Sequence, residues 1–389
     1  MIYFDNSATT NKKPKEVISA CNNALLNYSA NPGRSGHFLS LKTATKVFEI
    51  RKKIADYINC DKVENVIFTQ NCTDALNMAI LGTYIKGGHV ICSQNDHNSL
   101  IRPIFELKKK GLIDVSIAHA ENGHTLTAKD IEKHLRPNTY LVAINHVSNV
   151  NGDSAQIEQI GELCTKRCIL FLVDCAQSMG HEIINMKKQH IDMLAIAPHK
   201  GLYAMQGIGI FAFSVKVSPK PIRFGGTGTE SDNSYQPTDF PECLESGTIA
   251  TPNIFSVEAG IDFVKNNQNL INKKIDDLST FLLYELNKIN EIKLYTHTAN
   301  VHYGIIAFNV SGLDSNETAS ILSDNFNICV RGGLHCAGIK HSQLNTIHSG
   351  IVRASLSYYN SFTECEKFIK TIKIISKKMN WFTSFHFFN

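Results

Sequence analysis

The 389-residue sequence lacks the features that mark several classes of protein. No apolar run approaches the ~20 residues of a membrane-spanning helix. The opening MIYFDNSATT has neither the basic segment nor the apolar segment of an export signal. The formal net charge is only +4, which argues against nucleic acid or an anionic membrane as the main partner. These absences predict a globular protein of the cytoplasm, with no nucleic acid or membrane partner.

Cysteine is plentiful, yet it lacks the spacing of a zinc site or of a disulfide framework. The 11 cysteines are odd in number, are spread from Cys21 to Cys365, and include no C-x-x-C pair. We therefore expect no metal site and a reducing compartment. Most of these thiols are expected to be small buried side chains.

Short apolar runs alternate with longer segments between residues 65 and 214. Seven runs are predicted as strands: 65–69, 89–93, 114–118, 139–146, 169–174, 193–197 and 208–214. Most of the connecting segments are long enough to hold a helix, so we expect a largely parallel sheet with both faces buried. The predicted class is α/β.

Polar residues follow several of the predicted strands, at the carboxyl ends where open parallel sheets bind ligands. Lys200, Asp174 and His97 each lie at or just beyond a strand end. Cys72 and Thr73 open a helix, whose free backbone N–H groups would hold a phosphate. Each residue alone has an ordinary interpretation as a solvated side chain or a helix cap. Their recurrence at one edge indicates a binding site.

Together these side chains match the needs of pyridoxal phosphate. That cofactor takes a lysine for a Schiff base, a carboxylate at its pyridine nitrogen, a planar group against its ring and a phosphate cradle. Lys200, Asp174, His97 and the turn at 71–73 supply one of each. A nicotinamide-binding fold would instead need G-x-G-x-x-G after the first strand, where the chain reads TQNCTDALN. We therefore predict pyridoxal 5'-phosphate as the cofactor.

Several motifs occur in a fixed order along the chain. They are IYFDNSATT at 2–10, NPGRSGH at 31–37, NHVSN at 145–149, VDCAQ at 173–177, HK at 199–200, and ESGT at 245–248. With these motifs the sequence resembles the class V aminotransferase family of fold-type I pyridoxal phosphate enzymes. Within that family, RGGLHCA at 331–337 resembles the active-site cysteine segment of the short-loop, NifS-like cysteine desulfurases and selenocysteine lyases.

The resemblance implies a fold-type I transferase with a seven-stranded, mainly parallel sheet in a large domain and a smaller α+β domain. We expect the large, cofactor-binding domain at residues 1–260 and the small domain, with the cysteine loop, at residues 261–389. In an alternative division, residues 1–15 pack with the small domain. The last element of the small domain is predicted as an amphipathic helix over 362–379.

The resemblance also implies how the cofactor is held. Lys200 would form the Schiff base, Asp174 would keep the pyridine nitrogen protonated, and His97 would stack on the ring and take part in catalysis. The other implied cofactor residues are Gln177, Asn149, Cys72, Thr73, His199 and, from the neighbouring subunit of a homodimer, Thr248.

On the substrate side, Arg353, with Arg331 and Asn149, would bind the substrate carboxylate. Cys336 would attack the substrate sulfur as a thiolate, with His335 and Arg331 as the nearby basic groups. The implied reaction converts L-cysteine to L-alanine and leaves a persulfide on Cys336. A sulfur-acceptor protein would then receive this sulfur, as in iron–sulfur cluster biogenesis.

Other activities on the same fold stay open at this point: selenocysteine lyase, cysteine sulfinate desulfinase, C–S lyase and aminotransferase. A catalytically weak scaffold that binds a sulfur carrier predicts loss of Lys200 or Cys336, and both are present. Three places depart from the family pattern. Ala197 lacks a hydroxyl, residues 204–205 read Ala-Met, and Gly338 stands where proline is common.

Overall fold

The computed structural model describes residues 1–33, 35–121, 123 and 125–385. The chain divides into two compact units, which we call the large unit and the small unit. The large unit comprises Lys13–His146 and Ala155–Asn266, and the small unit comprises Met1–Lys12, Val147–Ser154 and the chain from Asn267 onward. The division expected at residue 260 falls within helix α7, Thr251–Asn287.

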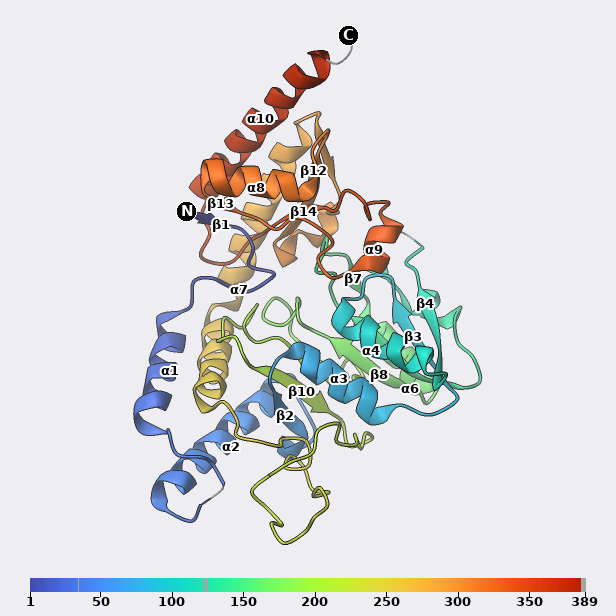
Figure 1. Cartoon of the computed structure of the whole chain (residues 1–389), viewed down its shortest axis with the longest axis vertical. Coiled ribbons are helices and arrows are strands. Elements are labelled where there is room, and N and C mark those ends of the chain that lie inside the picture. Colours follow the sequence, from blue (N-terminus) through green and yellow to red (C-terminus); the bar gives the residue numbers. More distant parts are fainter. Residues whose placement is uncertain (34, 122, 124, 386–389) are drawn as a thin grey trace. The chain divides into compact units, whose positions relative to one another are not determined.

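The core of the large unit is a seven-stranded sheet in the order β2-β10-β9-β8-β6-β3-β4 (Figure 1). The strands are β2 (Val66–Thr69), β3 (Gly88–Ser93), β4 (Ile113–Ala118), β6 (Thr139–Asn145), β8 (Leu170–Asp174), β9 (Met193–Ile196) and β10 (Gly209–Phe213). β10 pairs antiparallel with β2 and β9, and the other pairs are parallel. The predicted α/β class with a mainly parallel sheet is confirmed.

Every residue of β2, β3, β6, β9 and β10 is buried, which explains why these strands read as continuous apolar runs. The helices of this unit are α1 (Lys15–Asn27), α2 (Phe38–Ile58), α3 (Cys72–Thr83), α4 (Asn98–Lys109), α5 (Ala128–Glu132), α6 (Ile157–Lys166), the start of α7, and the 3-10 turn η1 (Val63–Asn65). Two short strands, β5 (Thr125–Leu126) and β7 (Ser154–Ala155), pair with each other. Helix α3 begins shortly after the end of β2, and helix α4 begins shortly after the end of β3. The first residues of both helices therefore lie near the carboxyl ends of these strands.

The small unit contains a three-stranded antiparallel sheet in the order β11-β12-β14. Its strands are β11 (Ile292–Leu294), β12 (Ile305–Val310) and β14 (Val352–Ser355), and a second sheet pairs β1 (Ile2–Tyr3) with β13 (Ile328–Cys329). Its helices are the end of α7, η2 (Thr298–Tyr303), α8 (Ser315–Phe326), α9 (Gly338–Gln343) and α10 (Phe362–Phe385). The helix predicted over 362–379 thus continues to Phe385.

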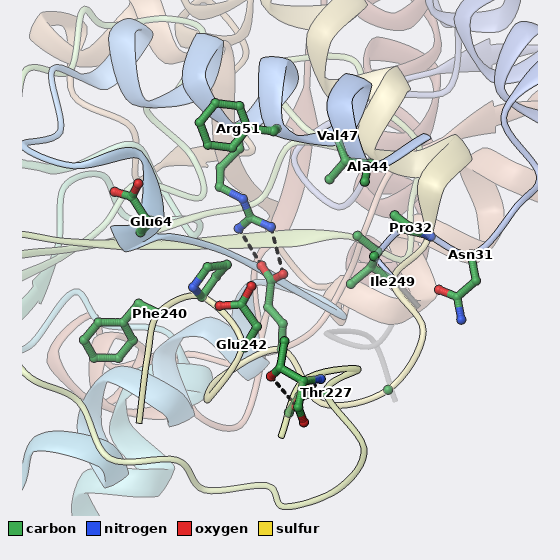
Figure 2. A pocket seen from close by; sticks show the side chains of 16 residues that line it. Asn31, Pro32, Ala44, Val47, Arg51, Glu64, Thr227, Phe240, Glu242 and Ile249 are labelled. Carbon is green, nitrogen blue, oxygen red and sulfur yellow. Dashed lines mark hydrogen bonds and ion pairs between the residues drawn. The ribbon is translucent and has the colours of Figure 1, made fainter. Parts of the chain in front are cut away.

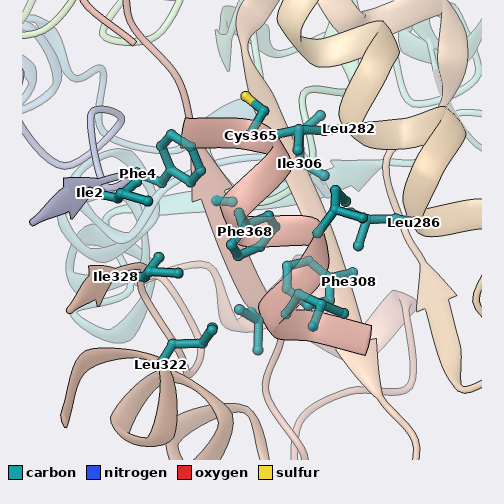
Figure 3. Close-up of a cluster of buried hydrophobic side chains, with 14 of the residues drawn as sticks. Ile2, Phe4, Leu282, Leu286, Ile306, Phe308, Leu322, Ile328, Cys365 and Phe368 are labelled. Carbon is teal, nitrogen blue, oxygen red and sulfur yellow. The ribbon is translucent and has the colours of Figure 1, made fainter. Parts of the chain in front are cut away.

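An apolar cluster holds the small unit together (Figure 3). The Phe368 ring of α10 packs edge-on against Phe4 and Phe308, with ring centroids 5.5 and 5.9 Å apart. Burial of one such side chain contributes roughly 1.5–3 kcal/mol. Val352 and Ala354 of β14 belong to the same cluster, so the core fixes the strand that carries Arg353.

None of the helices in the described part of the chain combines the length and the apolar character needed to cross a membrane.

Candidate active site

Lys200 lies in a tight turn that follows β9 in the large unit. Its backbone N–H donates to the Ala197 carbonyl at 3.1 Å, and its carbonyl accepts from the Tyr203 N–H at 3.0 Å. A Cβ atom at Gly201 would lie 2.0 Å from the Met179 carbonyl oxygen, so a side chain does not fit there. The turn therefore holds the Lys200 backbone in one position at the carboxyl end of the sheet.

Asp174 is the last residue of β8 and is buried. Its Oδ1 accepts from the Ala176 N–H at 2.9 Å and from the Cys72 thiol at 3.7 Å. Burial raises the pKa of the Asp174 carboxyl, and the Lys200 charge lowers it. Burial and the Asp174 charge raise the pKa of the Cys72 thiol, so this thiol is neutral. A buried carboxylate near a lysine, with no salt bridge among the described residues, fits a protonated ring nitrogen as its positive partner.

The turn after β2 opens helix α3 at Cys72. The Asn71 side chain caps this helix by accepting from the Asp74 N–H at 2.9 Å. The first N–H groups of a helix have no partner within the helix, and together with its dipole they attract a phosphate. The Thr73 hydroxyl lies 2.7 Å from the Ser99 hydroxyl, which joins the start of α3 to the start of α4. The arrangement fits the phosphate cradle expected at 71–73.

His97 caps helix α4. Its Nδ1 accepts from the Ser99 N–H at 3.1 Å, so the ring carries its proton on Nε2. The preceding residue, Asp96, is buried and accepts from the Ser93 and Asn145 N–H groups at 2.6 and 2.8 Å. Burial raises the pKa of Asp96 to about 7. Asp96 and Ser99 were not among the site residues predicted from the sequence. Their closeness to His97 in the chain is the signal that could have pointed to them.

The remaining cofactor candidates of the large unit lie on three different turns. His199 is neutral, because burial and the charge of Lys200 lower its pKa to about 4. Gln177 is buried in the turn after β8. Thr248 is exposed, and its hydroxyl accepts from the Asn31 amide at 3.4 Å. The large unit therefore holds every predicted cofactor residue except Asn149, which belongs to the small unit.

A cavity of about 350 Å³ in the large unit lies beside the loop that carries Thr248 (Figure 2). Arg51 of α2 forms a bidentate ion pair with Glu245 at 2.7 and 2.8 Å. Glu245 also accepts from the Phe68 N–H at 2.6 Å. The glutamate of the ESGT motif therefore anchors the Thr248 loop to α2 and β2. None of the described residues that line the cavity is a predicted cofactor residue.

In the small unit, Arg353 lies on β14 with only 1% of its surface exposed. Its Nη2 donates to Asp5 Oδ1 at 2.7 Å, and its Nη1 donates to the Asn149 carbonyl at 2.8 Å. Its Nε has no hydrogen-bond partner among the described residues. A buried guanidinium with an unpaired donor has capacity for an anion such as a carboxylate. Arg331 exchanges two backbone hydrogen bonds with Arg353, at 3.1 and 2.8 Å.

Asn149 connects Arg353 to the cysteine loop within the small unit. Its side-chain amide donates to the His335 carbonyl at 2.7 Å. Its Oδ1 is buried and has no hydrogen-bond partner in the described part of the chain. Buried polar atoms normally find a partner, so this oxygen is suited to accept a hydrogen bond from a bound molecule. The structure thus brings together all three residues predicted to bind substrate, because Arg353 is hydrogen-bonded both to Asn149 and to Arg331.

Cys336 is exposed on the loop between β13 and α9. His335 and Cys336 both have left-handed backbone angles, with φ of 48° and 57°. This conformation costs a non-glycine residue of order 1–3 kcal/mol. The base of the loop is closely packed: a Cβ at Gly332 or Gly350 would lie 2.4 or 2.2 Å from atoms of Ser315. The tight base holds the strained loop, and with it the thiol, in a defined position.

The expectation that His335 supplies positive charge beside Cys336 is wrong. The His335 side chain is buried, and its Nε2 donates to the Ile351 carbonyl at 2.9 Å. Burial, followed by the charge of Arg353, lowers the pKa of His335 to about 2, so the ring is neutral. Arg331 is the remaining cation expected from the sequence near the thiol.

The structure shows the surroundings of the three positions that depart from the family pattern. Ala197 is buried and offers the Lys200 turn its carbonyl but no hydroxyl. Ala204 is buried, and the Met205 N–H donates to the Ser256 hydroxyl at 3.0 Å. A Cβ at Gly338 would meet no atom of the described residues within 4 Å, so those residues do not require glycine there.

Comparison with known proteins places these residues in context. The sequence model of the family described as Aminotransferase class-V matches residues 2–368. A relative from Methanothermobacter thermautotrophicus, named "Probable cysteine desulfurase", is 32% identical over 384 residues, which cover 96% of this chain and 94% of the relative. A relative of the same name from Pyrococcus abyssi is 33% identical over 390 residues, which cover 97% of this chain and 95% of the relative.

Solved structures show the same similarity. The apo structure of cysteine desulfurase from Thermococcus onnurineus superimposes with a TM-score of 0.89 at 32% identity, and the match covers 97% of this chain and 95% of that chain. The cysteine desulfurase CsdA from Escherichia coli, at 21% identity, shares the fold with a TM-score of 0.83, and the match covers 97% of this chain and 94% of that chain.

Proposed function

The chain belongs to the class V aminotransferase family, and from that premise we propose how its residues remove sulfur from L-cysteine. It is a pyridoxal phosphate-dependent cysteine desulfurase, as its relatives and its fold indicate. The observation that carries the residue assignment is the exposed thiol of Cys336 on a strained, closely packed loop within the RGGLHCA segment.

Four residues of the large unit would hold the cofactor ring. When bound, pyridoxal phosphate supplies an electron sink that stabilises negative charge on the substrate Cα. Lys200 would bind the cofactor covalently and then move the proton at the substrate Cα. Asp174 would hold the proton at the ring nitrogen, a role that suits a buried carboxylate near a lysine. His97 would stack on the ring, and Gln177 would donate to its phenolic oxygen.

The phosphate would bind at the start of α3. The helix N-terminus at Cys72 and Thr73 offers backbone N–H groups and a hydroxyl. His199 would add a neutral hydrogen-bond donor, since its pKa is about 4. Thr248 would bind the phosphate in the neighbouring subunit. This role requires an exposed side chain, and Thr248 is exposed in this chain.

The carboxylate of L-cysteine would bind to Arg353, assisted by Arg331 and by the Asn149 side chain. The support is the unpaired Nε of Arg353 and the unpaired Oδ1 of Asn149, both buried in the small unit. Arg353 is already oriented by Asp5, so little ordering is needed when the carboxylate arrives.

The sulfur would pass to Cys336. Its thiolate attacks the substrate sulfur, so that an S–S bond forms while the substrate C–S bond breaks. The electron pair of the broken bond stays with the carbon fragment, which takes up protons and leaves as L-alanine. Cys336 becomes a persulfide, and the overall change needs no external oxidant. His335 is neutral, so it supplies no positive charge to this step.

We further propose a homodimer and a protein acceptor for the sulfur. Helices α1 and α2 expose large apolar side chains, including Leu26, Phe38 and Phe48, and exposed apolar groups of this size are typical of a protein interface. An acceptor protein would take the persulfide sulfur from Cys336, whose exposure permits that contact. None of the 11 cysteines, all of which lie in the described part of the chain, forms a disulfide, and this favours the reducing cytoplasm as the place of action.

The test is to incubate the purified protein with L-cysteine and to measure alanine and sulfide, with and without a reductant. Cys336→Ala is expected to lose sulfide and alanine production while it keeps the cofactor absorbance, and Lys200→Ala to lose both the absorbance and the activity. Cys168→Ala removes a second exposed thiol and is the matched control. Undiminished alanine from Cys336→Ala would contradict the proposal, and pyruvate with ammonia would indicate a C–S lyase.

A further inference from the structure

A buried ion pair ties the segment that carries Asn149 to the segment that carries Cys336. Lys340 Nζ donates to Asp153 Oδ2 at 2.6 Å, and the two side chains are 0% and 1% exposed. Lys340 lies in α9, which begins two residues after Cys336. Asp153 lies in Val147–Ser154 together with Asn149, and all of these residues belong to the small unit.

Both partners of the pair are held by further hydrogen bonds. Lys340 also donates to Gln343 Oε1 at 3.0 Å, and Asp153 Oδ1 accepts from the Asn300 amide at 3.3 Å. The Asp153 carbonyl accepts from the Ser148 N–H at 2.7 Å, which closes the loop around Asn149. Because apolar residues of similar size often replace a buried ion pair without loss of stability, stability alone does not explain the pair.

In the described part of the chain two hydrogen-bonded contacts join these segments, and the ion pair is one of them. The other is the hydrogen bond from the Asn149 side chain to the His335 carbonyl. One tie lies directly before Cys336 and the other lies one helical turn after it. A single hydrogen bond leaves two segments free to pivot about it, whereas two separated ties fix both distance and orientation.

We infer that Lys340 and Asp153 are positioning residues for sulfur transfer, because their ion pair fixes the Cys336 thiol relative to the Asn149 amide. This inference rests on the proposed roles of Asn149 and Cys336. Misplacement of a reacting group by about 1 Å costs up to about a hundredfold in rate. The loss is therefore expected in the transfer step, while cofactor binding is retained, because every predicted cofactor residue except Asn149 belongs to the large unit.

The test compares Lys340→Met, Asp153→Asn and the variant that carries both, in the full chain with its cofactor. After addition of L-cysteine, stopped-flow absorbance of the cofactor follows substrate binding, and mass spectrometry of quenched samples follows sulfur gain on Cys336. We expect the absorbance change to be retained and sulfur gain to slow about ten- to a hundredfold. Hydrogen exchange, measured without substrate, is expected to rise in both 147–154 and 335–343.

The variants and their control separate positioning from stability. Lys340→Met leaves a buried unpaired carboxylate, whereas the double variant leaves none and is expected to melt closer to wild type. If Lys340→Met does not fold, the double variant carries the test, and its sulfur transfer is expected to stay slow. Lys273→Met removes the exposed Lys273–Asp277 pair of α7 and is expected to behave as wild type.

Transfer at the wild-type rate in the folded variants would overturn the inference. Equal loss of the cofactor response and of transfer would also overturn it, since that pattern marks general damage to the fold. If the wild-type protein gains no sulfur on Cys336, the proposed function itself is contradicted, and with it the inference that rests on it. Transfer in wild type together with undiminished transfer in the variants overturns this inference alone.

Discussion

Asp5 orients Arg353: the guanidinium Nη2 donates to the Asp5 carboxylate at 2.7 Å. Arg353 is buried, whereas the Asp5 side chain is 21% exposed, so Asp5 is the charge that offsets the burial of the arginine. Asp5 lies two residues after the end of β1 and 348 residues from Arg353 in the chain, and it orients the arginine of the proposed carboxylate site.

Asp5→Asn is therefore expected to weaken L-cysteine binding. A hydrogen bond to a charged group contributes about 1.5–3 kcal/mol, so KM is expected to rise at least about tenfold. The value of kcat is expected to change less, because Asp5 does not touch the reacting sulfur. Steady-state kinetics of alanine release measure this split. Asp277→Asn, which breaks an exposed pair, is the control, and an unchanged KM in Asp5→Asn would contradict the proposed role of Arg353.

Two glycines beside Cys336 offer a steric test. A Cβ at Gly332 would lie 2.4 Å from the Ser315 carbonyl oxygen, so Gly332→Ala must shift the cysteine loop. Sulfur transfer is expected to fall about ten- to a hundredfold as the thiol moves. Gly338→Ala adds the same methyl group at a place where no atom of the described chain lies within 4 Å, and its activity is expected to stay near wild type. Equal activities of the two variants would show that loop position does not limit transfer.

Asp174→Asn tests the proton at the cofactor ring. Asparagine matches aspartate in size, yet it provides no charge to keep the ring nitrogen protonated. Alanine release is expected to fall by about a hundredfold or more, which is typical for loss of a positioned acid–base group. Absorbance of the bound cofactor is expected to persist, because Lys200 is unchanged. Activity near wild type would contradict the proposed role of Asp174 at the ring nitrogen of the cofactor.

His89 links stability to pH. Its Nδ1 and Nε2 lie 2.8 and 2.9 Å from the Thr139 and Ser116 hydroxyls, and burial lowers its pKa from 6.5 to about 4. Between those pH values the unfolded chain binds a proton that the folded protein does not. The stability from neutral His89 is therefore full above pH 6.5 and is lost as the pH falls toward 4. Melting temperature measured across this range is expected to fall less in His89→Gln than in wild type, and parallel curves would contradict the assignment.

Glu245→Gln tests the anchor of the Thr248 loop. The Arg51–Glu245 pair is buried, with 6% and 8% of the two side chains exposed. Removing one partner of a buried ion pair costs about 3–5 kcal/mol. We expect a lower melting temperature and weaker retention of the cofactor, measured by dialysis followed by absorbance. A melting temperature equal to wild type would show that the pair does not hold this loop.

The strands and the residues at their ends are predictable because their signals are local. Apolar runs mark the buried strands; Asp174 is the last residue of β8, and Lys200 and His97 lie a few residues past the ends of β9 and β3. Parallel strands then bring these ends to one edge of the sheet. The cofactor and the fold class are accordingly predicted from a few short segments.

The small unit is less predictable, because its site depends on long-range burial. Lys340 and Asp153 are 187 residues apart, and nothing in the sequence marks this lysine as buried. The neutral state of His335 follows from its enclosure beside Arg353, which residue order does not show. Segment Val147–Ser154 is set inside the sequence of the large unit and yet belongs to the small one.

The most direct test of sulfur transfer to Cys336 is a single turnover. The protein is mixed with less than one equivalent of L-cysteine without reductant, quenched, digested and analysed by mass spectrometry. Sulfur transfer to Cys336 predicts one added sulfur atom on the peptide that contains Cys336, in an amount equal to the alanine released. Alanine release without sulfur on Cys336, or sulfur found on another cysteine at first turnover, would contradict it.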